Sequence, residues 1–164
     1  MSMQFNADEV FEIAEEIEKN GAKFYRKAAQ GHINSRTRDL LLKLADREDA
    51  HQELFASMRA TLPDKERGWE IYDPEDQTAM YLKAMAQGQV FDAKADPSAR
   101  LTGEETEEEI LQMAMGLEKD SVVFYLRIQW IVPEKLGKDK ILDIIKEESD
   151  HLLQLDNELA ALKE

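Results

Sequence analysis

Cysteine is absent from this sequence of 164 residues. Its absence excludes disulfide bonds, thiolate catalysis, iron–sulfur clusters and cysteine-based zinc sites together. A metal ion bound by this chain would therefore have to be held by carboxylate and imidazole side chains.

The sequence also lacks a long uncharged apolar run and an excess of basic residues. No stretch approaches the roughly 18 apolar residues that a membrane span requires, and residues 1–10 lack the basic start and apolar run of a secretion signal. We therefore expect a cytoplasmic protein. With 21 basic against 35 acidic residues, the formal net charge is −14, which predicts no nucleic-acid or membrane partner and favours cations.

The length and composition predict one soluble domain that covers residues 1–164, with 43% hydrophobic and 34% charged residues. Four long segments show apolar residues at helical spacing, and all four prolines fall between them. The first helix is expected to begin at a cap formed by Asn6 or Asp8 and to end before Gly31, and the third to begin at Thr102 or Thr106. The expected helices span about residues 7–29, 35–61, 102–130 and 138–164.

Short connections join the first helix to the second and the third to the fourth, so each pair is expected to form an antiparallel helical hairpin. The segment 63–101 between the hairpins is far longer than a tight turn requires. The apolar spacing of Met80, Leu82, Met85 and Val90 predicts a short helix within it. The predicted fold is all-α: an antiparallel four-helix bundle of two helical hairpins, joined by a long crossover that contains a short helix.

The two predicted hairpins share one sequence pattern. A shift of one hundred residues aligns Glu18 and Tyr25 with Glu118 and Tyr125. Without a gap, the same shift brings the Glu48-x-x-His51 motif onto Glu148-x-x-His151.

The matched polar residues lie on the apolar faces of their helices. In the second helix the inward stripe runs through Leu44, Glu48, His51 and Phe55, in steps of three and four residues. The other three helices repeat this arrangement, so four carboxylates and two imidazoles are expected to point into one core. These candidate metal ligands are Glu18, Glu48, His51, Glu118, Glu148 and His151.

Buried carboxylates without partners cost several kcal/mol each, so a cluster of four requires cations. Two divalent ions would balance the four negative charges, and oxygen and imidazole ligands suit iron, manganese or zinc. One Glu from each of two helices and a Glu-x-x-His motif from each of the other two is the known ligand arrangement of ferritin-like carboxylate proteins.

Other polar residues are interpreted more simply. His32 falls in a predicted turn and is expected to be solvated. Tyr25 and Tyr125 lie on the inward stripes, where they could hydrogen-bond a ligand or relay an electron, although core packing is favoured. Glu15, Glu16, Glu53 and Glu147 fall off the stripes and are expected at the surface, with Glu15 and Glu53 close enough to contact the ligands from outside.

Segments 18–25 and 118–125, together with the two Glu-x-x-His motifs, resemble the rubrerythrin-related branch of the ferritin-like superfamily. The resemblance covers nearly the whole chain. It implies a non-haem di-iron centre, which members of that branch use to reduce peroxide or to react with dioxygen while oxidising ferrous iron.

The sequence departs from typical rubrerythrins in two places. It has no rubredoxin-like tail with cysteines, so electrons would come from a separate donor protein. Typical members also have an additional glutamate one turn before the lone Glu of the third helix, where this sequence has Met115. The ligand switching of the peroxidase depends on that glutamate.

The leading hypothesis is an oxidoreductase with two iron ions, for which zinc or manganese could substitute. Glu18 and Glu118 would bridge or terminate the ion pair, and each Glu-x-x-His motif would hold an ion, in a homodimer or higher homo-oligomer. No catalytic residue other than the ligands is assigned. The alternatives are a non-enzymatic protein that binds, stores or delivers iron, and a structural bundle filled with zinc.

Overall fold

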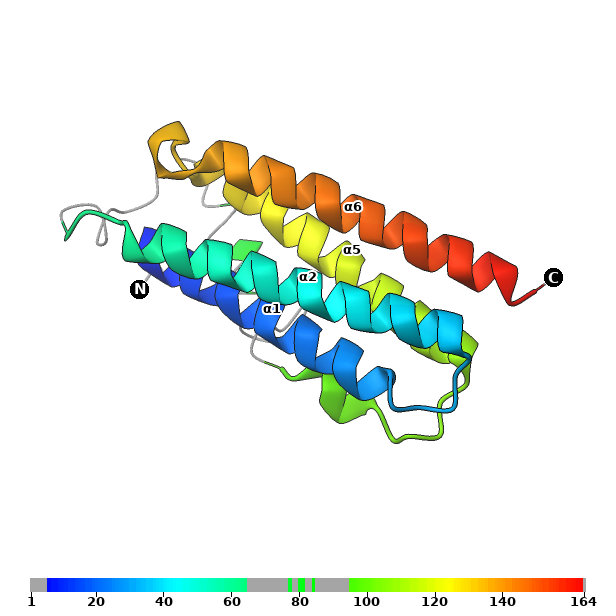
Figure 1. Cartoon of the computed structure of the whole chain (residues 1–164). Coiled ribbons are helices and arrows are strands. Elements are labelled where there is room, and N and C mark those ends of the chain that lie inside the picture. Colours follow the sequence, from blue (N-terminus) through cyan, green and yellow to red (C-terminus); the bar gives the residue numbers. More distant parts are fainter. Residues whose placement is uncertain (1–5, 65–76, 78–79, 82–83, 85–94, 164) are drawn as a thin grey trace.

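The computed structural model describes residues 6–64, 77, 80, 81, 84 and 95–163. Its long elements are the four expected helices, so the predicted all-α bundle is confirmed (Figure 1). The short helix expected around Met80 to Val90 falls largely on residues outside this description. The helical elements are α1 (Ala7–Ala28), α2 (Ser35–Ala60), the 3₁₀ turn η1 (Pro97–Arg100), α5 (Glu107–Ile131), the 3₁₀ turn η2 (Glu134–Leu136) and α6 (Lys138–Ala161).

Side-chain caps set the beginnings of three long helices. The side-chain oxygen of Asn6 accepts a hydrogen bond from the backbone N–H of Glu9 at 2.9 Å. In return, the Glu9 carboxylate accepts one from the backbone N–H of Asn6 at 3.0 Å. Of the two caps proposed for α1, the structure therefore uses Asn6. Of the two beginnings proposed for the third helix, the structure uses Thr106, which forms a capping box with Glu109 at the start of α5. Asn34 caps α2.

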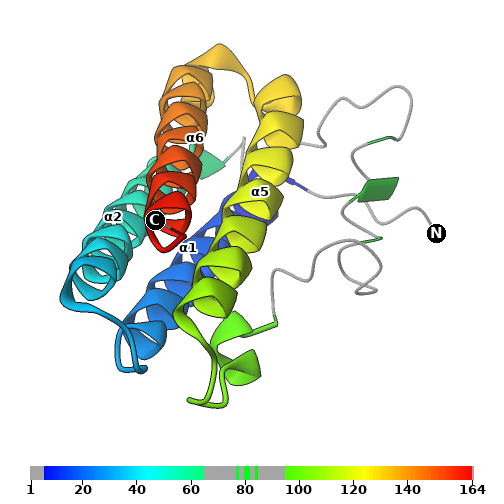
Figure 2. The ribbon, with the colours of Figure 1, turned by 90° about the vertical axis from the view of Figure 1, so that its right-hand side faces the viewer.

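The helices follow one another around a common core in the order α1, α2, α6, α5 (Figure 2). Within each hairpin the two helices are antiparallel neighbours (Figure 1). The end of α2 and the beginning of α5 lie at opposite ends of the bundle, which explains why the sequence between the hairpins is long. Among the described residues, no helix is long and apolar enough to cross a membrane.

The apolar core consists of two clusters of buried side chains. One cluster gathers around Phe11, Phe55 and Ile128, and the other around Phe24 and Leu111. Every long helix contributes to both clusters, and on every helix the predicted metal ligands lie between the two contributions. A polar layer therefore divides the core across its middle.

The turn between α1 and α2 is held by one guanidinium group. Arg38 donates hydrogen bonds to the carbonyl oxygens of Ala29 at 2.9 Å, Gly31 at 3.4 Å and Ile33 at 3.3 Å. These oxygens follow the last turn of α1, where carbonyl groups have no partner within the helix. Arg38 thereby fixes the angle at which the chain enters α2.

We predict that Arg38→Met, which keeps the apolar stem and removes the donors, lowers the free energy of unfolding by about 1–3 kcal/mol. Urea denaturation of the metal-free protein, followed by circular dichroism, measures this change. Lys43→Met, at an exposed position of α2, is the control and should change stability by less than about 0.5 kcal/mol. Equal effects of the two substitutions would contradict this role of Arg38.

Candidate metal centre

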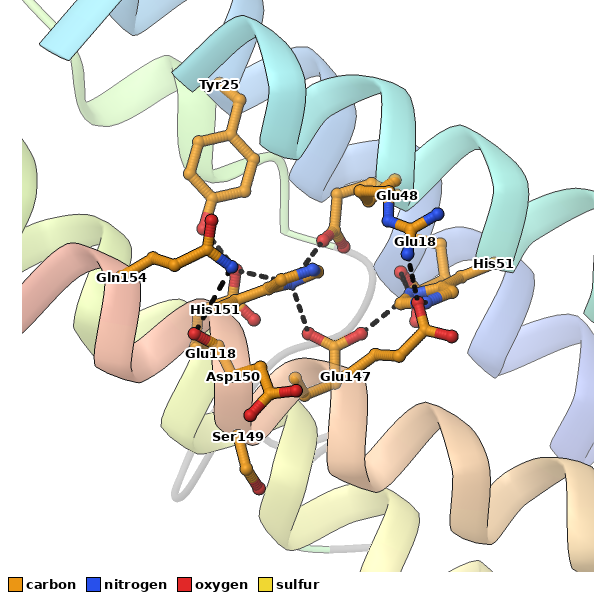
Figure 3. Close-up of polar contacts among 12 residues, drawn as sticks. Glu18, Tyr25, Glu48, His51, Glu118, Glu147, Ser149, Asp150, His151 and Gln154 are labelled. Atoms are coloured by element: carbon orange, nitrogen blue, oxygen red, sulfur yellow. Dashed lines mark hydrogen bonds and ion pairs between the residues drawn. The ribbon is translucent and has the colours of Figure 1, made fainter. Parts of the chain in front are cut away.

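The structure brings all six predicted ligands together in the polar layer of the core. Each of these side chains is buried, with 0–4% relative exposure. They come from four helices: Glu18 from α1, Glu48 and His51 from α2, Glu118 from α5, and Glu148 and His151 from α6. Figure 3 shows Glu48 on α2 and His151 on α6 directed toward each other from opposite sides of the bundle.

The six residues form two overlapping groups, each able to surround one ion. In each group, one ligand atom from every member lies within 4.8 Å of those of the others. Glu48 and Glu148 belong to both groups, whereas Glu18 and Glu118 each belong to one. Of the two roles that the sequence left open for Glu18 and Glu118, this geometry favours the terminal one. The first group is Glu18, Glu48, His51 and Glu148, and the second is Glu48, Glu118, Glu148 and His151.

Several ligand atoms in this layer are buried without a hydrogen-bond partner among the described residues. They include Nδ1 of both histidines, Oε2 of Glu18, Oε1 of Glu48 and both carboxylate oxygens of Glu148. Unpaired buried polar atoms destabilise a fold. Because these atoms face one another, two divalent cations would satisfy them together, and the residues fit such a pair of ions.

The close contacts show how tightly the groups converge. Nδ1 of His51 lies 2.8 Å from Oε1 of Glu148, and Nδ1 of His151 lies 3.4 Å from Oε2 of the same carboxylate. Glu148 therefore stands between the two imidazoles, whose rings stack with centroids 5.9 Å apart.

Glu147 contacts the outer side of this cluster, which corrects its interpretation as a surface residue only. Its Oε2 lies 3.1 Å from Nε2 of His51 and 3.3 Å from the guanidinium of Arg47. A carboxylate on the second ring nitrogen fixes the orientation of a metal-binding imidazole and raises its basicity. Of the two residues expected in such a role, Glu15 lies beside Arg59 at 3.6 Å and Glu53 is exposed. His32 is exposed, as predicted.

Two tyrosines connect the hairpins across the polar layer. The hydroxyl of Tyr25 on α1 donates a hydrogen bond to Glu118, and the hydroxyl of Tyr125 on α5 donates one to Glu18. Both rings are fully buried in the apolar clusters, and Tyr125 stacks on Phe55 with ring centroids 5.3 Å apart. Core packing, the role that the sequence favoured, and hydrogen bonding to a candidate ligand therefore occur together.

Without metal, burial and the neighbouring charges shift the pKa values of the groups in this cluster. Burial raises the pKa of Glu48 well above its ordinary value, and the neighbouring carboxylate of Glu148 adds to this. Burial likewise raises the pKa of Glu118. For Glu148, burial alone would raise the pKa, but contact with the Glu118 carboxyl group and the two imidazoles outweighs it and the pKa is lowered.

The two imidazoles are shifted toward their charged forms. Burial opposes the charge of His51, but the carboxylates of Glu148 and Glu18 outweigh it and raise the pKa of His51 to about 11. For the same reason, Glu118 and Glu148 raise the pKa of His151 to about 9 against the effect of burial. Metal binding therefore has to displace protons from this site.

We predict that Glu147→Gln lowers the affinity for metal about 10- to 100-fold, because the imidazole of His51 loses its charged outer partner. Titration of the metal-free protein with Co²⁺, followed by the ligand-field absorption, measures the affinity. The matched control is Asp150→Asn, which removes an exposed carboxylate from the same helix and should leave the affinity unchanged. An unchanged affinity in Glu147→Gln would contradict the role assigned to this contact.

We also predict that the metal-free protein loses stability as the pH rises. A raised histidine pKa contributes stability that is complete below the ordinary value of 6.5 and is lost as the pH rises through the folded values of about 9 and 11. The melting temperature of the metal-free protein should therefore fall from pH 6 to pH 9.

The control for this pH dependence is the double variant His51→Gln, His151→Gln, which lacks both titrating imidazoles. Its melting temperature should fall less between pH 6 and pH 9. The metal-loaded protein, in which cations replace the protons, should also show a smaller fall. A melting temperature of the metal-free protein that rises with pH would contradict the assignment.

Comparisons with known proteins support the fold. No family model matches the chain, and no curated protein matches it. Among solved structures, the chain is similar to the crystal structure of a Thermotoga maritima protein described as a candidate ferritin-like diiron-carboxylate protein. The TM-score is 0.66, the sequence identity is 24%, and the match covers 94% of each chain. The chain therefore has the ferritin-like four-helix fold, and its buried Glu and His cluster could hold metal ions.

Proposed function

We propose that this protein is a non-haem di-iron oxidoreductase of the rubrerythrin type, which reduces peroxide or dioxygen with electrons from a separate donor protein. One observation carries the proposal: four carboxylates and two imidazoles converge in a buried layer, and several of their ligand atoms have no hydrogen-bond partner. Such a cluster is costly unless cations occupy it.

The six residues would hold two ions, one in each of the two overlapping groups. Glu48 and Glu148 belong to both groups and would hold both ions. Glu18 with His51, and Glu118 with His151, complete the two groups. The four carboxylates balance the charge of two divalent ions, and a zinc or manganese pair would fit the same donor set.

When bound, a pair of ferrous ions supplies the two electrons that reduce an O–O bond. For hydrogen peroxide, two electrons and two protons break the O–O bond and leave two molecules of water. The protein's own contribution is to bury the ligands and to hold the carboxylates. The hydroxyl groups of Tyr25 and Tyr125 do the latter by donating to Glu118 and Glu18.

A second candidate function is iron binding for storage or delivery without catalysis. Met115, one turn before Glu118 on α5, is half-buried. It occupies the position at which the rubrerythrins that the sequence resembles have an additional glutamate. A thioether there offers no carboxylate for a change of ligand, which favours a simple six-ligand site.

We predict that untagged protein, purified from cells grown with ample iron, contains about two iron ions per chain by elemental analysis. Adding peroxide to the ferrous form should produce a near-ultraviolet absorption band of an oxo-bridged ferric pair. His151→Ala should lose both the second iron and the band. His32→Ala, at an exposed position, is the matched control and should keep both.

The outcomes separate the candidate functions. Two irons per chain without any reaction with peroxide or dioxygen would favour binding or delivery. Many irons per chain in a large closed assembly would favour storage, and zinc alone would favour a structural bundle. A protein that takes up no metal under any condition would contradict the proposed centre itself.

A further inference from the structure

A cavity of about 250 Å³ lies between α1 and α5 and reaches the polar layer. Its inner end is formed by Glu48, Glu118 and Tyr25. Its outer rim includes the exposed Arg100 and the half-buried Asp96 of the segment around η1. The cavity thus leads from the surface to two of the candidate ligands.

The two hairpins contribute matching walls to this cavity. Ile17 and Leu117 occupy equivalent positions in the sequence repeat, as do Gly21 and Ser121, and all four line the cavity. Gly21 and Ser121 lie one turn beyond the lone glutamates Glu18 and Glu118. Small side chains at these positions keep the approach to the carboxylates open.

Gly21 shows how little space remains at the inner end. A Cβ atom at this position would lie 3.0 Å from Oε2 of Glu48, which is closer than almost all ordinary contacts of a Cβ atom. The absence of a side chain at Gly21 therefore leaves the Glu48 carboxylate accessible from the cavity.

The opposite side of the cluster is covered. There, His51 and His151 come from α2 and α6, and the ion pair of Glu147 with Arg47 lies over the outer nitrogen of His51. Neither histidine lines the cavity. The cavity therefore approaches the carboxylates from across the cluster, on the side away from the imidazoles.

The chemistry of the walls selects the kind of molecule that fits. Ile17, Leu117 and Pro97 make the walls apolar, whereas the inner end has carboxylates and a hydroxyl group. At the rim, Asp96 is paired with Lys23, and Arg100 and Asp120 also line the cavity. Because apolar walls lead to polar groups at the inner end, an uncharged molecule with one polar end suits the cavity.

We propose that this cavity binds the oxidant, and that it accepts an alkyl hydroperoxide with a small apolar group as well as hydrogen peroxide. The inference deepens the proposed function and rests on it. The cavity of about 250 Å³ is several times the roughly 30 Å³ that a water molecule occupies in the liquid, so it has room for a substituent of a few carbon atoms. The reduction balances when two ferrous ions give two electrons: with two protons, the hydroperoxide yields one alcohol and one water.

The first experiment tests occupancy of the cavity without any redox reaction. tert-Butanol, an unreactive analogue, is titrated into the metal-free protein while methyl groups are followed by NMR. The methyl signals of Ile17 and Leu117 should shift and saturate, whereas that of Ile110, buried in the core but not lining the cavity, should not. Ser121→Leu, which extends a side chain into the cavity, should abolish these shifts.

The second experiment tests the substrate class in the iron-loaded, reduced protein. Stopped-flow absorbance gives the rates of oxidation by tert-butyl hydroperoxide and by hydrogen peroxide. Ser121→Leu should lower the rate of oxidation by tert-butyl hydroperoxide at least tenfold. It should lower the rate of oxidation by hydrogen peroxide by a smaller factor. Gly116→Leu is the matched control, because it places the same side chain on α5 where a Cβ atom meets nothing within 4 Å. If Ser121→Leu fails to fold, Leu117→Phe narrows the same cavity from a half-buried position.

Each outcome decides a separate point. If tert-butanol does not shift Ile17 and Leu117, or if it shifts Ile110 equally, the cavity does not bind such molecules and the inference is overturned. If wild-type protein reacts with hydrogen peroxide but not with tert-butyl hydroperoxide, or if Ser121→Leu slows both equally, the substrate class is wrong. If the NMR shifts appear but neither peroxide reacts, the proposed function fails while the binding cavity stands.

Discussion

The structure depends on the burial of four carboxylates at one level of a helical bundle. Removing a carboxylate from water is expensive, and placing several within a few ångströms of one another adds repulsion. The apolar clusters on either side of the polar layer hold the four helices together and thereby force this convergence. Protons or cations must then neutralise the layer. Burial raises the pKa of Glu48 and of Glu118, which favours their protonated forms in the metal-free protein.

The same layer joins the two halves of the molecule. Tyr25 on one hairpin donates to Glu118 on the other, and Tyr125 donates to Glu18 in return. His51 of the first hairpin contacts Glu148 of the second. Ions bound between these side chains would tie α1 and α2 to α5 and α6, so metal binding and the association of the hairpins are thermodynamically coupled.

The approximate two-fold repeat does not make the two sides of the cluster alike. One Glu-x-x-His motif lies on α2 and the other on α6. The imidazoles and the contact of Glu147 with His51 therefore occupy one side of the cluster. The lone glutamates lie on α1 and α5, where Gly21 and Ser121 leave a cavity. One side of the cluster is thus covered by the ion pair of Glu147 with Arg47, whereas a cavity reaches the other side.

By itself, the sequence determined the helical fold, the pairing of the helices into hairpins and the six side chains of the polar layer. These features follow from local rules: the period of the apolar stripe, the capping residues near the helix starts, and a repeat that places Glu48-x-x-His51 and Glu148-x-x-His151 in one register. The tertiary structure alone decided which glutamates belong to both ligand groups, the partner of each tyrosine, the contact of Glu147 with His51, and the cavity between α1 and α5. These features join residues that are far apart in the chain, and they depend on how the helices are rotated and spaced. The periodicity of a single helix does not specify that rotation, because it arises only when both apolar clusters pack at once.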